Sequence, residues 1–181
     1  MEFEKLETER LILRKLTQSS YDYIFKELND SEIILFLGLK STEELTQEKA
    51  KYTEGLSTCN RHFLNFQLIE KKANAIIGAC GFHAWSIDHK RAEIGYGIFE
   101  DTNKKQGFMT EAIIPIIQYG FNEMNLVRIE AFLGTKNPAS KGLLEKLNFT
   151  KEGLLRQHYC QNNVMEDSLV YGLLKTDYNQ Y

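Results

Sequence analysis

A basic turn followed by a helix is the part of this sequence best suited to bind an anionic ligand. Lys104 and Lys105 lie in a polar run that ends at Gly107, and an apolar pattern of helical spacing begins at Phe108. The free backbone N–H groups and the positive dipole end of a helix N-terminus attract phosphate groups. Glycine at the turn lets backbone amides approach such a ligand without a Cβ atom in the way. We therefore predict a phosphate-binding turn; the alternative is an ordinary strand–loop–helix unit with solvated lysines.

The segment before this turn has the pattern of a short strand. Residues 93–99 are apolar and aromatic, and they include Gly95 and Gly97. Glycine within a strand indicates a bulge or the close approach of another group to the backbone. After the turn, one apolar stripe predicts a core-facing helix with a kink at Pro115. The stripe consists of Phe108, Ala112, Ile113, Ile116, Ile117 and Phe121.

The remaining elements predict a mixed α/β arrangement. Strands are expected over residues 9–16, 63–70, 75–85 and 127–133, and a final hairpin over 150–158 and 164–175. Helices are expected over residues 21–28 and 43–58 and after Asn137, with an apolar segment over 33–39 left without a secondary structure. A hairpin in the middle of the chain argues against a doubly wound Rossmann domain. We therefore predict one domain over residues 1–181, an α/β (α+β) fold with a mixed, mostly antiparallel sheet and helices on both faces.

The composition of the 181 residues indicates an ordinary globular protein, with 43% hydrophobic and 26% charged residues. A net charge of −3 argues against sequence-independent nucleic-acid binding, which needs a basic excess. The acidic start does not resemble a signal peptide and no apolar run reaches transmembrane length, so we expect a cytoplasmic protein without membrane contact. Cys59, Cys80 and Cys160 fit no metal-ligand spacing. We expect buried, reduced thiols and no metal.

Three sequence blocks, in the same order, resemble the GNAT acyltransferases. They are LETERLILRKLT from Leu6, AEIGYGIF…GFMTEAI from Ala92, and RIEAFLGTKNPASKGLLEKLNFTKEG from Arg128. The resemblance is specifically to the RimJ/RimL type, the ribosomal-protein N-terminal amine acetyltransferases and their relatives, and it extends to about Lys175. It implies a GNAT-like fold and an N-acetyltransferase that uses acetyl-CoA as co-substrate. The acceptor would be a primary amine, either a protein N-terminus or a small amine, and a homodimer is left open.

The resemblance also implies which residues bind CoA. In the family, a Q/R-x-x-G-x-G/A loop holds the pyrophosphate through its amides, and the matching residues 102–107 keep only the final glycine. The strand before this loop would lie alongside the pantetheine, and two residues of the later helix match the family's N-x-x-S. The implied cofactor-binding residues are Ile98, Phe99, Lys104, Lys105, Gln106, Gly107, Phe108, Met109, Thr110, Asn137 and Ser140.

The implied reaction is direct attack of an uncharged amine on the thioester carbonyl, which needs a base for the ammonium proton and gains from an acid for the departing thiolate. Glu93 is the first candidate base, Glu130 the second, and Ser140 the candidate acid. For Glu93 the alternative is a purely structural role in its strand, and for Asn137 the alternative is helix capping. We interpret His83 as a half-buried hydrogen-bonding residue.

One departure from the family pattern keeps other functions open. Some RimL-type proteins carry a glutamate just after the EG segment, where this chain has Gln-His-Tyr at residues 157–159. The altered glycine loop and this missing carboxylate make a non-catalytic acyl-CoA sensor or scaffold the main alternative. A nucleotide-binding module of another fold is a weaker one, because it would leave two of the three blocks unexplained.

Overall fold

The structure is a computed structural model that describes residues 2–53 and 63–178. Within these residues, eight strands form one sheet in the order β1-β2-β3-β4-β5-β6-β8-β7. The strands are β1 (Lys5–Glu7), β2 (Leu11–Leu16), β3 (Leu64–Glu70), β4 (Ala75–Ser86), β5 (Arg91–Ile98), β6 (Arg128–Gly134), β7 (Thr150–Gln161) and β8 (Val164–Leu174). Neighbouring strands are antiparallel except β5 and β6, which are parallel. The predicted mixed, mostly antiparallel sheet is therefore confirmed.

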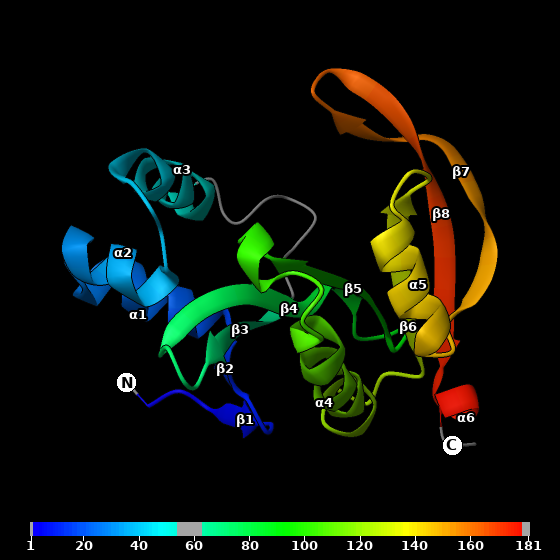
Figure 1. Cartoon of the computed structure of the whole chain (residues 1–181), viewed down its shortest axis with the longest axis horizontal. Helices are drawn as coiled ribbons and strands as arrows, with labels where there is room; N and C mark the ends of the chain where they lie inside the picture. Colours follow the sequence, from blue (N-terminus) through cyan, green and yellow to red (C-terminus); the bar gives the residue numbers. More distant parts are fainter. Residues whose placement is uncertain (1, 54–62, 179–181) are drawn as a thin grey trace.

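Helices cover both faces of this sheet (Figure 1). One face carries α1 (Gln18–Glu27), α2 (Asp30–Leu37) and α3 (Thr42–Thr53), and the other carries α4 (Phe108–Asn122) and α5 (Pro138–Lys146). A short 3-10 helix, η1 (Asp101–Asn103), connects β5 to α4, and α6 (Lys175–Tyr178) follows β8. None of the helices in the described part of the chain is long and apolar enough to cross a membrane.

The helix α4 fills the centre of the larger core. All six residues of the predicted stripe are buried, and the helix continues through Pro115. At Gly120 the packing against the sheet is tight, since an added Cβ atom would lie 2.6 Å from the Phe82 ring. The amphipathic stripe thus predicted both the helix and the face that it buries.

The N-terminal half contains an additional helix and an additional strand relative to the prediction. Residues of the unassigned apolar segment form α2, which begins at a capping box in which the Asn29 side chain accepts from Glu32 N and the Glu32 side chain accepts from Asn29 N. Gly38, in a left-handed conformation with φ 71°, ends it. The strand β1 was not predicted. The expected end of the helix over residues 43–58 lies outside the described residues, as does Cys59.

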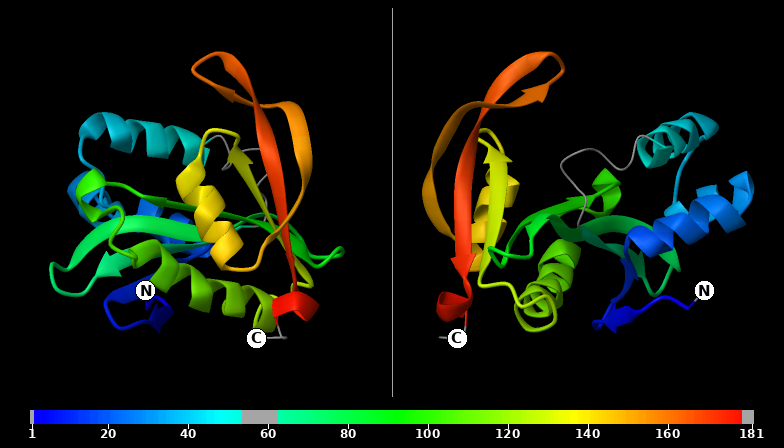
Figure 2. Two further views of the ribbon diagram at one scale, coloured as in Figure 1. Left: turned by 45° about the vertical axis from the view of Figure 1, so that its right-hand side comes forward. Right: turned by 180° about the vertical axis from the view of Figure 1, so that it is seen from behind.

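The strands β7 and β8 form a long hairpin whose tip projects from the body of the molecule (Figure 2). Asn162 and Asn163 connect them with φ values of 50° and 61°, which suits the tight turn of a two-residue hairpin. The expectation of buried thiols is wrong for Cys160, which is exposed because the outer part of β7 has no helix packed on it. Cys80 is buried in the sheet, and this burial raises the pKa of its thiol.

Candidate active site

The strands β5 and β6 separate in the middle of the sheet. Their parallel pairing covers only three positions and ends at Glu93 opposite Glu130, whereas β5 remains paired with β4 as far as Ile98. In the described sheet, the other edge of residues 94–98 therefore has no strand partner. Such an edge offers N–H and C=O groups to an extended ligand, as in strand addition by peptides.

A cavity of about 500 Å³ lies at this open edge. It is enclosed by β5, the turn before α4 and the first turns of α5. The lining residues are Tyr96, Gly97, Ile98, Asn103, Lys104, Lys105, Gly107, Phe108, Met109, Thr110, Asn137, Ala139, Ser140 and Leu143. All of the predicted cofactor-binding residues are among them except Phe99 and Gln106. The structure thus brings an open strand edge and a helix N-terminus together in one cavity.

The two other predicted residues lie elsewhere. Phe99 lines a second cavity that also includes Lys40 and Gln67, beneath the helices α1 to α3. Gln106 stabilises the turn itself, because its Nε2 donates to the Thr102 carbonyl at 2.6 Å.

The turn before α4 adopts a left-handed backbone at two positions. Gly107, the residue before the helix, has φ 81°, and Lys105 has φ 60°. A non-glycine residue in this region costs about 1 kcal/mol or more. Lys104 Nζ lies 2.6 Å from Asp101 Oδ1, and this hydrogen bond lowers the pKa of Asp101. Among the described residues, no hydrogen bond or ion pair engages the Lys105 side chain, so it is the more available cation.

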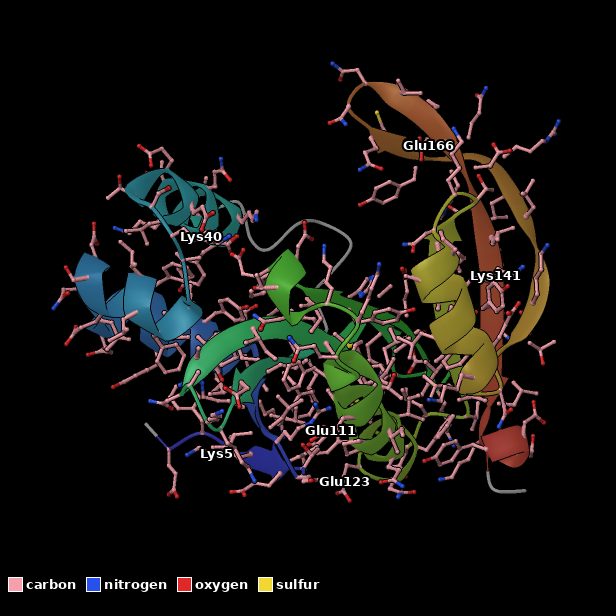
Figure 3. The ribbon with its side chains drawn as sticks, in the orientation of Figure 1. Lys5, Lys40, Glu111, Glu123, Lys141 and Glu166 are labelled. Atoms are coloured by element: carbon pink, nitrogen blue, oxygen red, sulfur yellow. The ribbon has the colours of Figure 1, made fainter. Side chains whose placement is uncertain are left out.

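A hydrogen-bonded cluster connects this turn to the N-terminal strands. Glu111 projects from the first turn of α4 toward β1 and β2 (Figure 3). Its carboxylate accepts from Arg10 Nε and from Thr8 Oγ1, both at 2.6 Å, while Arg10 Nη1 donates to the Gln106 carbonyl at 3.1 Å. The Arg10 guanidinium also lies 4.3 Å from the centroid of the Phe108 ring. The cluster therefore holds the turn before α4, which borders the cavity, against the turn between β1 and β2.

The charge of Glu111 is favoured by these contacts. Burial acts to raise the pKa of Glu111, but the hydrogen bonds from Thr8 and Arg10 outweigh it, so that this pKa lies below its ordinary value. No local pattern in the sequence indicates this cluster, because Arg10 and Glu111 are about one hundred residues apart.

The start of α5 brings two polar side chains to the same cavity. Asn137 Oδ1 accepts from Ser140 N at 3.0 Å, so Asn137 caps the helix as well as lining the cavity. Tyr96 reaches across from β5. Burial raises the pKa of Tyr96 to about 12, and a hydrogen bond with Ser140 partly offsets this. Tyr96 was not among the predicted residues, although the two-residue period of the strand places it on the same face as Ile98.

Glu93 points to the opposite face of the sheet, the one that α1 to α3 cover. It pairs in register with His83 of β4, and His83 Nε2 lies 3.0 Å from Glu93 Oε1. Both side chains are partly exposed, His83 by 35% and Glu93 by 24%. Glu93 is also the last residue before β5 leaves β6. It therefore lies where a group entering from this face would meet the open strand edge.

Glu130, the other candidate base, is held in an arginine network. Its two carboxylate oxygens accept from Arg91 Nη1 at 2.9 Å and from Arg128 Nε at 2.8 Å, and Arg128 also pairs with Glu152. Guanidinium groups keep their charge at any physiological pH and do not take up a proton. Of the two carboxylates, Glu93 is therefore the one with a titratable partner.

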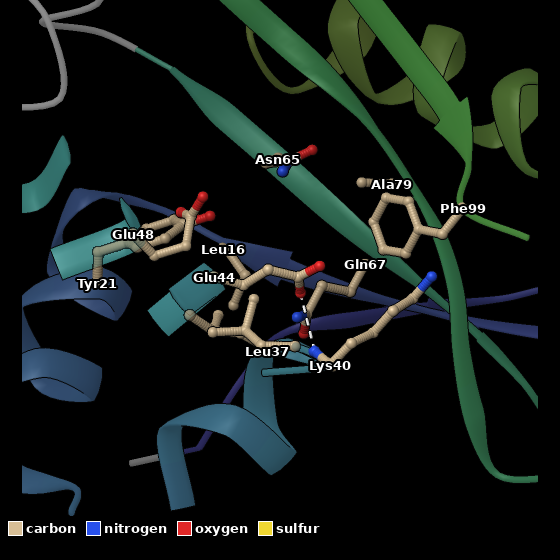
Figure 4. A pocket seen from close by; sticks show the side chains of 12 residues that line it. Leu16, Tyr21, Leu37, Lys40, Glu44, Glu48, Asn65, Gln67, Ala79 and Phe99 are labelled. Carbon is tan, nitrogen blue, oxygen red and sulfur yellow. Dashed lines mark hydrogen bonds between the residues drawn. The ribbon is translucent and has the colours of Figure 1, made fainter. Parts of the chain in front are cut away.

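Figure 4 shows the second cavity, which has a volume of about 410 Å³. It lies on the same face of the sheet as Glu93, since Ala79, which lines it, is paired with Gly97 of β5. Polar side chains from the sheet and from α3 line it, among them Asn65, Gln67, Glu44 and Glu48. Asn65 is paired with Gly81 of β4, which places this end of the cavity two residues along β4 from His83. The site thus has a cavity on each face of the sheet, with the open edge of β5 between them.

Comparison with known proteins agrees with this architecture. A family model described as an acetyltransferase (GNAT) domain matches residues 10–150. The uncharacterized N-acetyltransferase YoaA of Bacillus subtilis is 36% identical over 174 residues, which cover 96% of this chain and 98% of the relative.

Two solved structures have the same fold. The ribosomal-protein-S5-alanine acetyltransferase of Vibrio fischeri superimposes with a TM-score of 0.68 at 21% identity, over 97% of this chain and 98% of that one. Mutant forms of the spermidine/spermine N-acetyltransferase SpeG from Vibrio cholerae give a TM-score of 0.68 at 20% identity, over 96% of this chain and 98% of that one. At these identities the likeness establishes the fold alone.

Proposed function

The chain belongs to the acetyltransferase (GNAT) family, and on this premise we propose that it transfers an acetyl group from acetyl-CoA to a primary amine. Membership of the family makes it an N-acetyltransferase with an acyl-CoA donor. The acetyl group, the acceptor and the residue roles below are the proposal, and so is its organisation as a single domain over residues 1–181.

One observation carries the proposal: the open edge of residues 94–98 and the N-terminus of α4 line the same cavity. A CoA thioester has the two features that such a cavity needs, an extended amide-containing arm and a pyrophosphate. The backbone of β5 would hold the arm, while the amides of residues 107–110 and the Lys105 side chain would hold the phosphates. On the opposite face, which Gly97 shares with Glu93, there is also room beside the strand, because a Cβ atom at Gly97 would meet nothing within 4 Å.

The bound thioester supplies an acyl group that an amine can attack directly. The amine must first lose its ammonium proton. Glu93 supplies the negative charge that this step requires, on the face where the second cavity could admit an acceptor. Glu130 is the weaker candidate, since two arginines already occupy its oxygens. On the other face, the Ser140 hydroxyl, which is hydrogen-bonded with Tyr96, would give a proton to the departing thiolate.

For the acceptor we propose an α-amine, such as the N-terminus of a protein. An α-amino group has a pKa of about 7.7–8.0 and a lysine side chain one of about 10.4, so deprotonation at pH 7 costs roughly 3 kcal/mol less for the α-amine. The fold-level relatives include enzymes named for a ribosomal protein and for polyamines. Polyamines are therefore the competing acceptor class.

A turnover assay with an amine panel tests the proposal. The purified protein is given acetyl-CoA with peptides that begin with free Ala or Ser, with spermidine, with an aminoglycoside and with an N-blocked lysine peptide. We expect CoA release and acetylated product, fastest with the free N-termini. Faster acetylation of lysine side chains would contradict the α-amine acceptor.

The same assay tests the non-catalytic alternative. If acetyl-CoA binds by calorimetry and no amine in the panel is acetylated, the sensor or scaffold function is favoured. Glu93→Gln should lower kcat at least tenfold, since general base catalysis contributes about 10²–10⁴-fold. Glu130→Gln serves as the matched carboxylate variant. A larger loss of kcat in Glu130→Gln than in Glu93→Gln would make Glu130 the better candidate for the base.

A further inference from the structure

We infer that His83 receives the proton of the acceptor amine and that Glu93 acts by holding this imidazole in the required tautomer. The inference deepens the proposed function and rests on it. It changes the interpretation of His83, for which the sequence suggested only a hydrogen-bonding residue at the end of a strand.

The contact between the two side chains indicates this division of roles. His83 Nε2 is the ring nitrogen that faces Glu93 Oε1, at 3.0 Å. A carboxylate at this distance favours a proton on Nε2, since it can only accept a hydrogen bond. The other nitrogen, Nδ1, is then the unprotonated acceptor of the neutral ring.

Two backbone features place the ring over the open part of β5. The strand β4 has a bulge between His83 and Ser86, and Ala84 inside it has a left-handed φ of 46°. Bulges of this kind turn a side chain away from the regular direction of the strand, and they often occur beside active sites. Gly95 provides the space, because a Cβ atom there would lie 3.0 Å from His83 Cε1 and 3.3 Å from His83 Nδ1. The Nδ1 edge of the ring therefore lies over Gly95, on the open part of β5.

The chemistry of the step favours an imidazole over a lone carboxylate. A free carboxylate of the glutamate type has a pKa near 4.3, whereas a free imidazole has one near 6.5, closer to the operating pH of a general base. The N–H bond of the ammonium breaks, the proton passes to Nδ1, and the nitrogen lone pair forms the new bond to the acyl carbon. The C–S bond of the thioester then breaks, and the surplus proton on the nitrogen passes to the departing CoA thiolate by way of the Ser140 hydroxyl. The imidazolium that results lies beside the Glu93 carboxylate and afterwards returns the proton to water.

Other ionisable groups face this pair from the neighbouring strands. On β6 these are Glu130 and Arg128, and Arg91 lies on β5. The ring of His158, from β7, packs on Phe132 of β6 and lies farther along the same face. Because Glu130 is compensated by two arginines, Glu93 is the carboxylate that the structure places against His83.

The first test follows the pH dependence of turnover. In His83→Gln the amide can still donate to Glu93 but cannot take up a proton. We expect kcat/KM with an Ala-starting peptide to fall at least tenfold at pH 7, and the acidic limb of its pH profile to disappear. His89→Gln, in the exposed turn before β5, is the matched control and should keep the wild-type profile. A wild-type profile in a folded His83→Gln protein would overturn the inference.

The second test needs no turnover. The 15N shifts of the histidine rings in the intact protein report which nitrogen carries the proton. We expect His83 to be the Nε2–H tautomer in the neutral wild-type ring and to lose this preference in Glu93→Gln. An Nδ1–H ring in the wild type, or a ring unaffected by Glu93→Gln, would overturn the inference even if the panel of amines shows no acetylation. Absent acetylation with the expected tautomer would instead count against the proposed function.

Discussion

At the scale of single residues, the two neighbouring lysines of the turn before α4 are not equivalent. Lys104 is paired with Asp101, while the Lys105 side chain has no such partner within the described chain. Lys105 also occupies a left-handed backbone position that favours glycine. A strained residue that keeps a free cation at the mouth of a cavity is better explained by ligand binding than by stability.

We expect Lys105→Ala to weaken acetyl-CoA binding more than Lys104→Ala does. The loss should be about threefold to tenfold at low salt and should shrink at 0.5 M salt, since exposed charges are screened. Calorimetric titration with acetyl-CoA measures it, with Lys72→Ala in the β3–β4 turn as the control. If all three variants bind acetyl-CoA with equal, salt-independent affinity, the backbone amides alone bind its phosphates and the lysine side chains contribute nothing.

Ser140→Ala tests the acid at the start of α5. A thiol with a pKa near 8.5 already leaves readily at neutral pH, so we expect kcat to fall only about tenfold to a hundredfold, at the lower end for acid catalysis. The affinity for acetyl-CoA should change little. Measurement of kcat and melting temperature on the same preparation separates this role from the alternative that the Ser140 hydroxyl only meets backbone in the first turn of α5. A lower melting temperature with unchanged kcat per folded molecule would leave Ser140 a structural role.

At the scale of elements, the position of α4 depends on the contact of its first turn with β1 and β2. The pKa of Glu111 is lowered in the folded protein, so the charged carboxylate stabilises the fold at pH values above the pKa that Glu111 has in the unfolded chain. This contribution is lost as the pH falls through the lower pKa of the folded state. The helix start, which forms one wall of the cavity, is therefore held more firmly near pH 7 than in acid.

Glu111→Gln should reveal this dependence. We expect the free energy of unfolding to fall by about 1–2 kcal/mol at pH 7, because the hydrogen bonds to a charged group are lost. The difference from wild type should shrink as the pH falls below the ordinary value of 4.5. Urea unfolding at several pH values measures it, and Glu9→Gln in the same turn is the control. A difference that stays constant with pH would mean that the charge is not responsible.

Two helical glycines should respond in opposite directions to alanine. At Gly120 of α4 a Cβ atom would lie 2.6 Å from the Phe82 ring, whereas at Gly142 of α5 it would meet nothing within 4 Å. Gly120→Ala should therefore destabilise the protein by about 1–3 kcal/mol through overpacking, and Gly142→Ala should stabilise it by about 0.5–1 kcal/mol through helix propensity. Thermal unfolding of both variants is the measurement. A stable Gly120→Ala protein would contradict the tight packing of α4 on β4.

At the scale of the whole molecule, the separation of β5 and β6 divides the sheet into two parts. Strands β1 to β5 and strands β6 to β8 are joined there by three parallel positions. The turn that follows β5 and the start of α5, which follows β6, both line the cavity at the opening between the two parts. A ligand that bridges the cavity would therefore connect the two parts and stabilise the folded state of both.

Acetyl-CoA at one hundred times its dissociation constant should stabilise the protein by about 2.7 kcal/mol. For a chain of this size that corresponds to a rise in melting temperature of about 5–10 °C. Differential scanning fluorimetry with acetyl-CoA, CoA and ATP measures it, and ATP tests whether any nucleotide is sufficient. No shift at millimolar acetyl-CoA, with calorimetry also silent, would contradict cofactor binding at this cavity.

The sequence by itself determined the features that depend on local periodicity and local capping. The stripe of α4 is buried as predicted, Asn137 caps α5, and the Asn-rich turn joins β7 to β8, because burial of one helix face or strand face leaves a repeat in the sequence. The family's blocks likewise identified most of the residues that line the cavity at the open edge.

Only the tertiary structure decided which distant residues act together. Arg10 meets Glu111, His83 meets Glu93, and Arg91 meets Glu130, in each case across strand pairing or helix packing that has no sequence repeat. The sequence already ranked Glu93 before Glu130 as the candidate base, and these contacts add a physical reason for that order, since the two carboxylates lie in neighbouring strands and differ in their partners. The physical reason is that periodicity records whether a side chain is buried, whereas the proton chemistry of a carboxylate depends on which charges lie within a few ångströms of it.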